Sequence, residues 1–203
     1  MYGNVADYFA ANRVIGINAT YRLAPGAQWP EAARDVGLAL AWARANIGSY
    51  GGDPERIFLM GQSAGATHVA TYAFRRDLHL AAGPGLAGAI LMSGPYALDV
   101  GKVSPNAMAY FGEDPSRDAA MQVLGNIECA DFPVYVSMAE FDPAPFERSA
   151  LELLLQLFRA TGRAPRFKQL LGHNHVSPAF SFGTDDPSVG PDVLDFVHGT
   201  GIT

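Results

Sequence analysis

One serine in this chain stands in a setting that could make it a nucleophile. Ser63 lies in a G-x-S-x-G pattern, the run Gly-Gln-Ser-Ala-Gly at 61–65. Glycines on both sides permit a sharp turn from a strand into a helix, which exposes the serine hydroxyl at the end of the strand. The backbone N–H of Ala64 then points to where an oxyanion develops during attack on a carbonyl carbon. An incidental Gly-rich turn is the alternative, but an apolar run before the pattern and a helical pattern after it favour the nucleophile.

A nucleophilic serine needs a base, and the base needs an acid that orients it. Asp142 follows an apolar run at 134–138 and precedes Pro143, so we expect it in a loop at the carboxyl end of a strand. An ordinary Asp-Pro turn is the alternative role for this residue, and Glu140 is the alternative acid. The chain order Ser, then Asp, then His is the one found in hydrolases whose serine sits on such a turn.

Two histidines, His173 and His175, follow the last predicted strand, where the base should lie. Histidines one residue apart are also found at metal sites. However, no set of His, Cys, Asp and Glu at suitable spacing completes such a site, so we predict no metal.

The elements that must position these groups alternate between short apolar runs and helical patterns, which indicates an α/β domain with a mostly parallel sheet and helices on both faces. We expect a single domain over 1–203. Strands are predicted at 14–19, 57–60, 87–92, 134–138 and 167–171, and helices at 4–12, 30–47, directly after Ser63, 146–158 and 192–197. The piece at 94–132 is too long for a routine connection, so we expect a lid or a pocket-lining insertion there.

Composition narrows the classes of partner. The 203 residues carry 20 acidic and 14 basic side chains, a net charge of -6, with no basic cluster that would favour nucleic acid or an anionic membrane. No apolar run is long enough to span a bilayer. Cys129 is the only cysteine, which fits a reducing compartment, and the first residues do not resemble a signal peptide. We therefore expect a cytoplasmic location.

Several short motifs resemble, in order and across most of the chain, the α/β-hydrolase carboxylesterases of the hormone-sensitive-lipase-like group. They are YRLAP at 21–25, WP at 29–30, GGDPERI at 51–57, GQSAGA at 61–66, AEFDP at 139–143 and GHNH at 172–175. The resemblance implies Ser63 as nucleophile, Asp142 as acid and His175 as base, because in similar esterases the base precedes a small apolar-plus-Ser step. His173 is the second choice. It also implies hydrolysis of short-chain carboxylic esters through an acyl-enzyme, without a cofactor.

One departure from that group concerns the oxyanion hole. Similar enzymes carry a His-Gly-Gly-Gly loop upstream of the segment that resembles 4–12, and no such loop is found here. We therefore expect an N-terminally shortened chain that lacks the first three strands of the fold and has a gap beside the strand 57–60. Three explanations are open for that gap. Residues 14–19 could pair with 57–60, or a second copy could cover the edge in a homodimer. Alternatively, the missing part is supplied by a separate chain or was lost by truncation of a longer gene.

The expected partner is a small ester substrate. Five residues are candidates for contact with it: Gln62, Tyr96, Met108, Tyr110 and Phe111. The last four lie in the 94–132 segment and could instead form its own small core. The predicted function is that of a serine carboxylesterase. The alternatives are a catalytically silent hydrolase-like domain, suggested by the absent loop, and an amidase that uses the same three residues.

Overall fold

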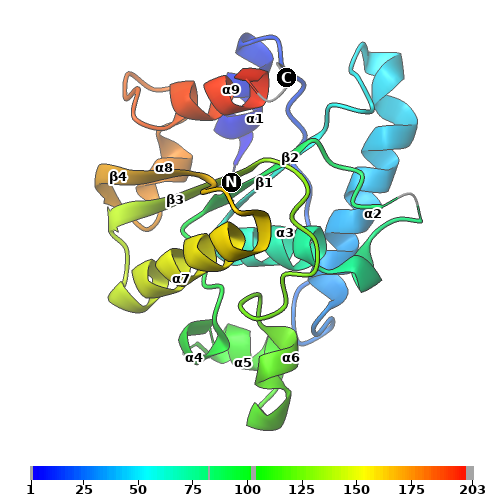
Figure 1. Cartoon of the computed structure of the whole chain (residues 1–203). Helices are drawn as coiled ribbons and strands as arrows, with labels where there is room; N and C mark the ends of the chain where they lie inside the picture. Colours follow the sequence, from blue (N-terminus) through cyan, green and yellow to red (C-terminus); the bar gives the residue numbers. More distant parts are fainter. Residues whose placement is uncertain (1, 82, 102–103, 200–203) are drawn as a thin grey trace.

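A sheet of four parallel strands forms the centre of the molecule (Figure 1). The computed structural model describes residues 2–81, 83–101 and 104–199. Side by side, the strands are β1 (Phe58–Gln62), β2 (Gly88–Met92), β3 (Val134–Phe141) and β4 (Arg166–Asn174). Because all four run the same way, their carboxyl ends meet at one edge of the sheet, where ligands of parallel sheets bind.

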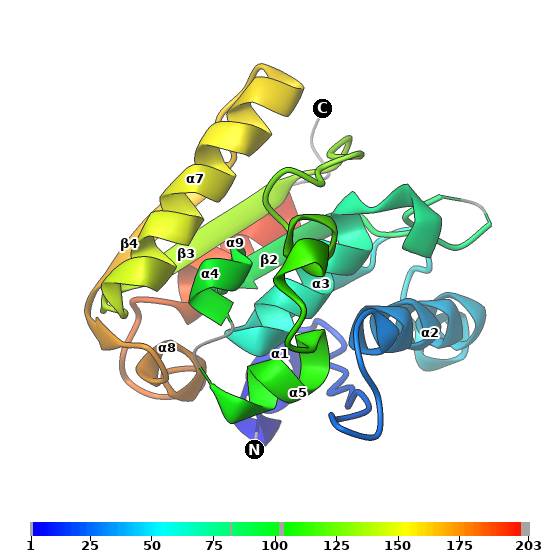
Figure 2. The same ribbon diagram turned by 90° about the horizontal axis from the view of Figure 1, so that it is seen from below.

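Helices connect the strands and cover both faces of the sheet. The longer ones are α1 (Gly3–Ala11), α2 (Glu31–Asn46), α3 (Ala64–Phe74), α7 (Ala144–Thr161) and α9 (Gly190–Gly199). The shorter ones are α4 (Leu98–Gly101), α5 (Pro105–Phe111), α6 (Asp118–Met121) and α8 (Ser177–Phe180), with 3-10 turns η1 (Ile47–Tyr50), η2 (Arg76–Leu78) and η3 (Pro115–Arg117). Figure 2 shows α7, α3 and α2 on one side of the sheet and α9 on the other.

The alternation of side chains along β2 explains this three-layer arrangement. Ala89 and Leu91 point into a cluster formed with α3 and α7, whereas Ile90 and Met92 point into a second cluster formed with α1 and α9. All four side chains are buried, so β2 has an apolar face on each side. Strands with helices on both faces are expected to be almost uniformly apolar. The predicted α/β architecture, a parallel sheet with helices on both faces, is therefore confirmed.

Most predicted elements are present, with small shifts at their ends. The structure confirms all five predicted helices and the strands at 57–60, 87–92, 134–138 and 167–171. The last strand is longer than predicted, because β4 continues to Asn174, and His173 therefore lies on the strand and not after it. Residues 94–132 include α4, α5, η3 and α6, and nothing in these elements decides between a lid and a pocket lining.

The predicted strand at 14–19 is wrong. These residues are irregular, and the side chains of Ile15 and Ile17 are 44% and 49% exposed. Gly16 lies so close to α1 that a Cβ there would come 2.6 Å from Ala6 Cα, so contact with the helix holds this segment instead of sheet pairing. The expected pairing of 14–19 with β1 is therefore wrong as well. Among the described residues, β1 pairs with β2 alone and its other side is an open edge.

Candidate active site

The backbone at Ser63 has the strained geometry of a nucleophile turn. Ser63 lies between β1 and α3 with φ 55° and ψ −125°, a conformation that residues with a Cβ rarely adopt. Its N–H donates to Met92 O at 2.9 Å, which ties the turn to the end of β2. A Cβ at Gly61 would overlap the backbone of Gly65, so this turn is closed by two chain segments in direct contact. This close approach explains why glycine stands at 61, whereas a Cβ at Gly65 would meet nothing within 4 Å.

Three side chains form a continuous hydrogen-bonded line at the carboxyl edge of the sheet. His175 Nε2 lies 2.8 Å from Ser63 Oγ, and His175 Nδ1 lies 2.7 Å from Asp142 Oδ1. Since a carboxylate can only accept, Nδ1 carries the proton and Nε2 is left to accept from the serine hydroxyl. The structure thus brings together the three residues that the sequence singled out, from the ends of β1, β3 and β4.

The acid of this line is buried and held in place by the backbone. The Asp142 side chain is fully covered, whereas the His175 side chain is 26% exposed. Burial alone would raise the pKa of the Asp142 carboxyl, but hydrogen bonds from His175 and from the Ala139 N–H (2.8 Å) outweigh it, so the pKa lies below its ordinary value. The carboxylate therefore stays ionised at neutral pH and can stabilise a protonated imidazole.

Two further contacts fix the His175 ring and its backbone. Gln62 Nε2 donates to His175 O at 2.6 Å, so the residue before the nucleophile holds the residue that would act as its base. Tyr2 Oη donates in turn to Gln62 Oε1 at 3.1 Å. Phe146 packs edge-on against the imidazole with ring centroids 5.1 Å apart. Gln62 was a candidate for substrate contact, and in the structure its amide contacts the chain itself.

Ala64 is the first residue of α3, so its N–H has no carbonyl partner within the helix. Ala64 is an exposed residue next to Ser63, and its N–H lies at the positive end of the helix dipole. Its exposure and its place in the helix dipole both suit an oxyanion donor.

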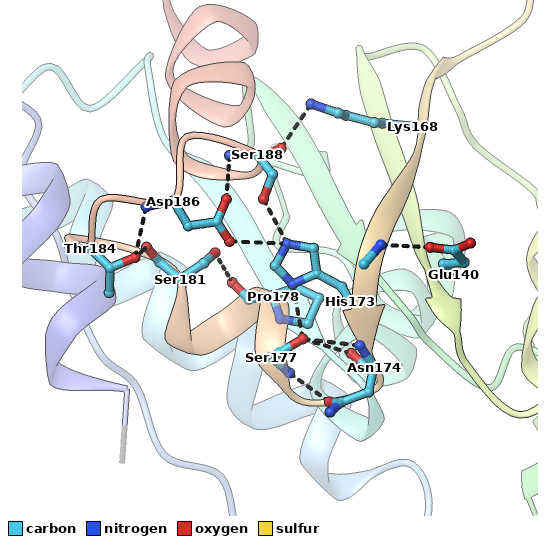
Figure 3. Close-up of polar contacts among 11 residues, drawn as sticks. Glu140, Lys168, His173, Asn174, Ser177, Pro178, Ser181, Thr184, Asp186 and Ser188 are labelled. Carbon is cyan, nitrogen blue, oxygen red and sulfur yellow. Dashed lines mark hydrogen bonds and ion pairs between the residues drawn. The ribbon is translucent and has the colours of Figure 1, made fainter.

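The alternative acid and the alternative base are engaged elsewhere. Glu140 Oε2 accepts the Gly172 N–H at 2.6 Å on the neighbouring strand. His173 is buried, and its ring lies among Ser177, Ser188 and Asp186 (Figure 3). Neither residue contacts the hydrogen-bonded line. Among the described residues, no group of three or more His, Cys, Asp and Glu side chains could hold a metal ion.

The predicted pocket residues divide into two kinds. Tyr96, Tyr110 and Phe111 are buried, and the last two belong to a small cluster with Leu98 and Met121. Met108, by contrast, is 41% exposed. The cluster is packed within the 94–132 segment and against α2, which favours the small-core interpretation for Tyr110 and Phe111.

Sequence reasoning missed the residues that support the site. Phe146, the Ala139 N–H and the group around His173 were not singled out. A signal for the last group was present, because the run Thr-Asp-Asp-Pro-Ser at 184–188 is rich in turn-forming residues. The contact of Phe146 with His175 joins elements far apart in the sequence, so the pattern alone could not reveal it. The Ala139 N–H lies only three residues from Asp142, but its contact depends on how the chain turns after β3.

The comparison with family models identifies the class of the chain. Residues 4–178 match the model of a family described by the alpha/beta hydrolase fold, so the chain belongs to this family. The match covers all three residues of the hydrogen-bonded line.

Named relatives of the chain are esterases. Esterase LipC of Mycobacterium tuberculosis is 32% identical over 127 residues, which cover 63% of this chain and 26% of LipC. Esterase LipQ of the same organism is 46% identical over 59 residues, or 29% of this chain and 14% of LipQ. The chain therefore matches well under two thirds of the length of these relatives.

The solved structure of the thermophilic esterase Est2 of Thermogutta terrifontis, with propionate bound, has a TM-score of 0.74 and 20% identity, covering 97% of this chain and 76% of that chain. At this identity the likeness shows a shared fold.

No helix within the described residues combines the length and the apolar character needed to cross a bilayer.

Proposed function

We propose that this chain is a serine esterase that hydrolyses short-chain carboxylic esters through an acyl-enzyme. The observation that carries the proposal is the line Ser63–His175–Asp142, with hydrogen bonds of 2.8 and 2.7 Å. Membership of the alpha/beta hydrolase family and the esterase relatives support it. The propionate bound to Est2 of Thermogutta terrifontis supports a short acyl group.

The geometry suits each proton transfer of the reaction. His175 Nε2 takes the proton of Ser63 as Oγ attacks the ester carbonyl carbon, and the imidazolium is stabilised by the buried Asp142 carboxylate. The tetrahedral oxyanion accepts a hydrogen bond from the Ala64 N–H. Collapse breaks the bond to the alcohol oxygen, which receives the proton from His175. Water, activated by the same imidazole, then releases the acid and restores the Ser63 hydroxyl.

A single assigned oxyanion donor sets an expectation for the rate. Loss of one such donor costs about 100- to 1,000-fold in turnover in enzymes that use two. We therefore expect a measurable but slow esterase if Ala64 acts alone.

Hydrolysis of p-nitrophenyl acetate and butyrate tests the proposal. We expect Ser63→Ala to abolish turnover and Asp142→Asn to lower it by about 10⁴-fold, because the amide favours the wrong imidazole tautomer. A fluorophosphonate should label wild-type protein once per chain and leave Ser63→Ala unlabelled. Equal hydrolysis by wild type and Ser63→Ala, together with no labelling, would refute the proposal and favour a catalytically silent domain. Faster turnover of a matched anilide than of the ester would favour an amidase.

A further inference from the structure

A second imidazole, that of His173, is not used in the proposed reaction. It lies buried beside residues 174–177, the turn that carries His175 (Figure 3). The His173 ring is 6% exposed, and both of its nitrogens are engaged. Nδ1 lies 2.9 Å from Ser177 Oγ. Nε2 lies 2.6 Å from Ser188 Oγ and 3.2 Å from Asp186 Oδ2. The ring therefore links two loops that follow β4, one of which carries His175.

The loop on the Nε2 side is firmly anchored. Asp186 Oδ1 accepts the Ser188 N–H at 2.9 Å, and Lys168 Nζ on β4 donates to Ser188 O at 2.8 Å. Lys168 also pairs with Asp192 at the start of α9. This loop is therefore tied both to the sheet and to a helix.

The tautomer of the His173 ring follows from its acidic partner, Asp186. Hydrogen bonds that the Ser188 hydroxyl and the Ser188 backbone N–H donate to the Asp186 carboxylate hold the pKa of this group below its usual range. An ionised carboxylate can only accept, so Nε2 of His173 donates towards Asp186 and Ser188. In the neutral ring Nδ1 is then an acceptor, and the Ser177 hydroxyl donates to it.

The loop on the Nδ1 side is the turn that presents His175. Ser177 Oγ accepts the Asn174 N–H at 3.0 Å. Asn174 Oδ1 accepts the N–H groups of Val176 and Ser177, both at 3.1 Å. These bonds close a tight turn over 174–177 with His175 in its middle. The hydroxyl that His173 holds is therefore one of the two side-chain groups that close this turn, the other being the Asn174 amide oxygen.

We propose that His173 is a positioning residue that fixes the 174–177 turn through Ser177, so that His175 Nε2 faces Ser63 Oγ. The turn is then held on two sides, by Gln62 at the His175 carbonyl and by His173 at the Ser177 hydroxyl. This inference rests on the proposed function for its effect on rate. A misplacement of about 1 Å in a catalytic group can cost on the order of 100-fold in rate.

Two substitutions remove the hydrogen bond between His173 and Ser177, one from each of its two partners. In His173→Gln the side-chain amide reaches the position of Nε2, so contacts with Asp186 and Ser188 can be kept. Ser177 Oγ then loses its hydrogen bond to His173 and keeps only its contacts with Asn174. Ser177→Ala removes the same hydrogen bond from the other side, together with the one that Ser177 Oγ accepts from the Asn174 N–H. His198→Gln is the matched control, because His198 is exposed on α9.

We expect His173→Gln and Ser177→Ala each to lower kcat by about 10- to 100-fold with KM within about twofold of wild type, because the acid–base group and not the binding site is displaced. The double variant should be no slower than the slower single variant, since the hydrogen bond that His173→Gln removes is already absent in Ser177→Ala. The control should match wild type. Values of kcat within about twofold of wild type for both single variants would overturn the proposal.

Amide hydrogen exchange at 174–177 provides a readout that does not depend on turnover. We expect His173→Gln to speed exchange of the Asn174, Val176 and Ser177 amides by about tenfold or more, while amides of β2 stay protected. If wild type neither hydrolyses esters nor reacts with a fluorophosphonate, the proposed function fails and exchange alone decides: unchanged exchange overturns the inference. If wild type is active, unchanged kcat overturns it whatever the exchange shows.

Discussion

His68 makes the stability of this protein sensitive to mild acid. The residue lies on α3, is 6% exposed and has its ring between those of Tyr21 and Tyr110, with centroids 4.6 and 5.0 Å away. Burial lowers the pKa of His68 from 6.5 to about 4. The folded protein therefore keeps this imidazole neutral at pH values where the unfolded chain would protonate it.

The size of the effect follows from proton linkage. The folded-state pKa of His68 is lower than the unfolded one. This histidine therefore does not reduce the free energy of unfolding above pH 6.5, and it reduces that free energy progressively as the pH falls from 6.5 to about 4. With these two values, His68 lowers the free energy of unfolding by about 2 kcal/mol at pH 5 and by about 3 kcal/mol below pH 4. Below that range both states bind the proton and the loss stops.

Urea unfolding at pH 7.5 and pH 5, followed by tryptophan fluorescence, measures this loss. Trp29 lies in the cluster with Tyr110 and should report on the region directly. We expect the fall in unfolding free energy between the two pH values to be about 2 kcal/mol smaller in His68→Phe than in wild type. His198→Gln, exposed on α9, should behave like wild type. Equal falls in wild type and His68→Phe would refute the reasoning.

Three further predictions concern the nucleophile turn and the sheet edge. Gly61→Ala should lower the free energy of unfolding by about 1–3 kcal/mol in urea, because the new methyl overlaps the Gly65 backbone, and an unchanged midpoint would contradict this packing. Gln62→Leu should lower kcat by about fivefold, the worth of one lost hydrogen bond to His175, whereas a change in KM alone would favour substrate contact. Light scattering should show a concentration-dependent homodimer, because β1 has an open edge in the described part of the chain; a monomer at every concentration would exclude pairing there.

Sequence patterns predicted the sheet well where both faces of a strand are buried. β2 reads as a continuous apolar run because helices cover it on each side, and such runs have few alternative structures. The segment 14–19 is equally apolar in pattern, yet a strand also needs a neighbour with free backbone groups. Gly16 instead lies against α1, a contact between segments that periodicity cannot reveal.

In the candidate site, too, sequence patterns predicted the ends of the strands but not the contacts between distant segments. Ser63, Asp142 and His175 could be selected because each follows an apolar run, and parallel strands bring such ends together. Part of the support around them could not be selected, since it consists of contacts between segments that are distant in the sequence, such as that of Gln62 with the His175 carbonyl. The end of β4 was also misjudged, because its pairing with β3 is irregular near Phe141 and extends the strand to Asn174.

The positive φ of Ser63 restricts which residues this position can accept. A β-branched side chain is poorly tolerated at φ 55°, so threonine could not readily replace the serine even though it carries the same hydroxyl. Glycine, by contrast, would relieve a strain of about 1–3 kcal/mol. We therefore expect Ser63→Gly to unfold at a higher urea concentration than Ser63→Ala. The residue best suited to the backbone here is one that cannot attack a carbonyl, so a chain selected for stability alone would drift away from serine at this turn.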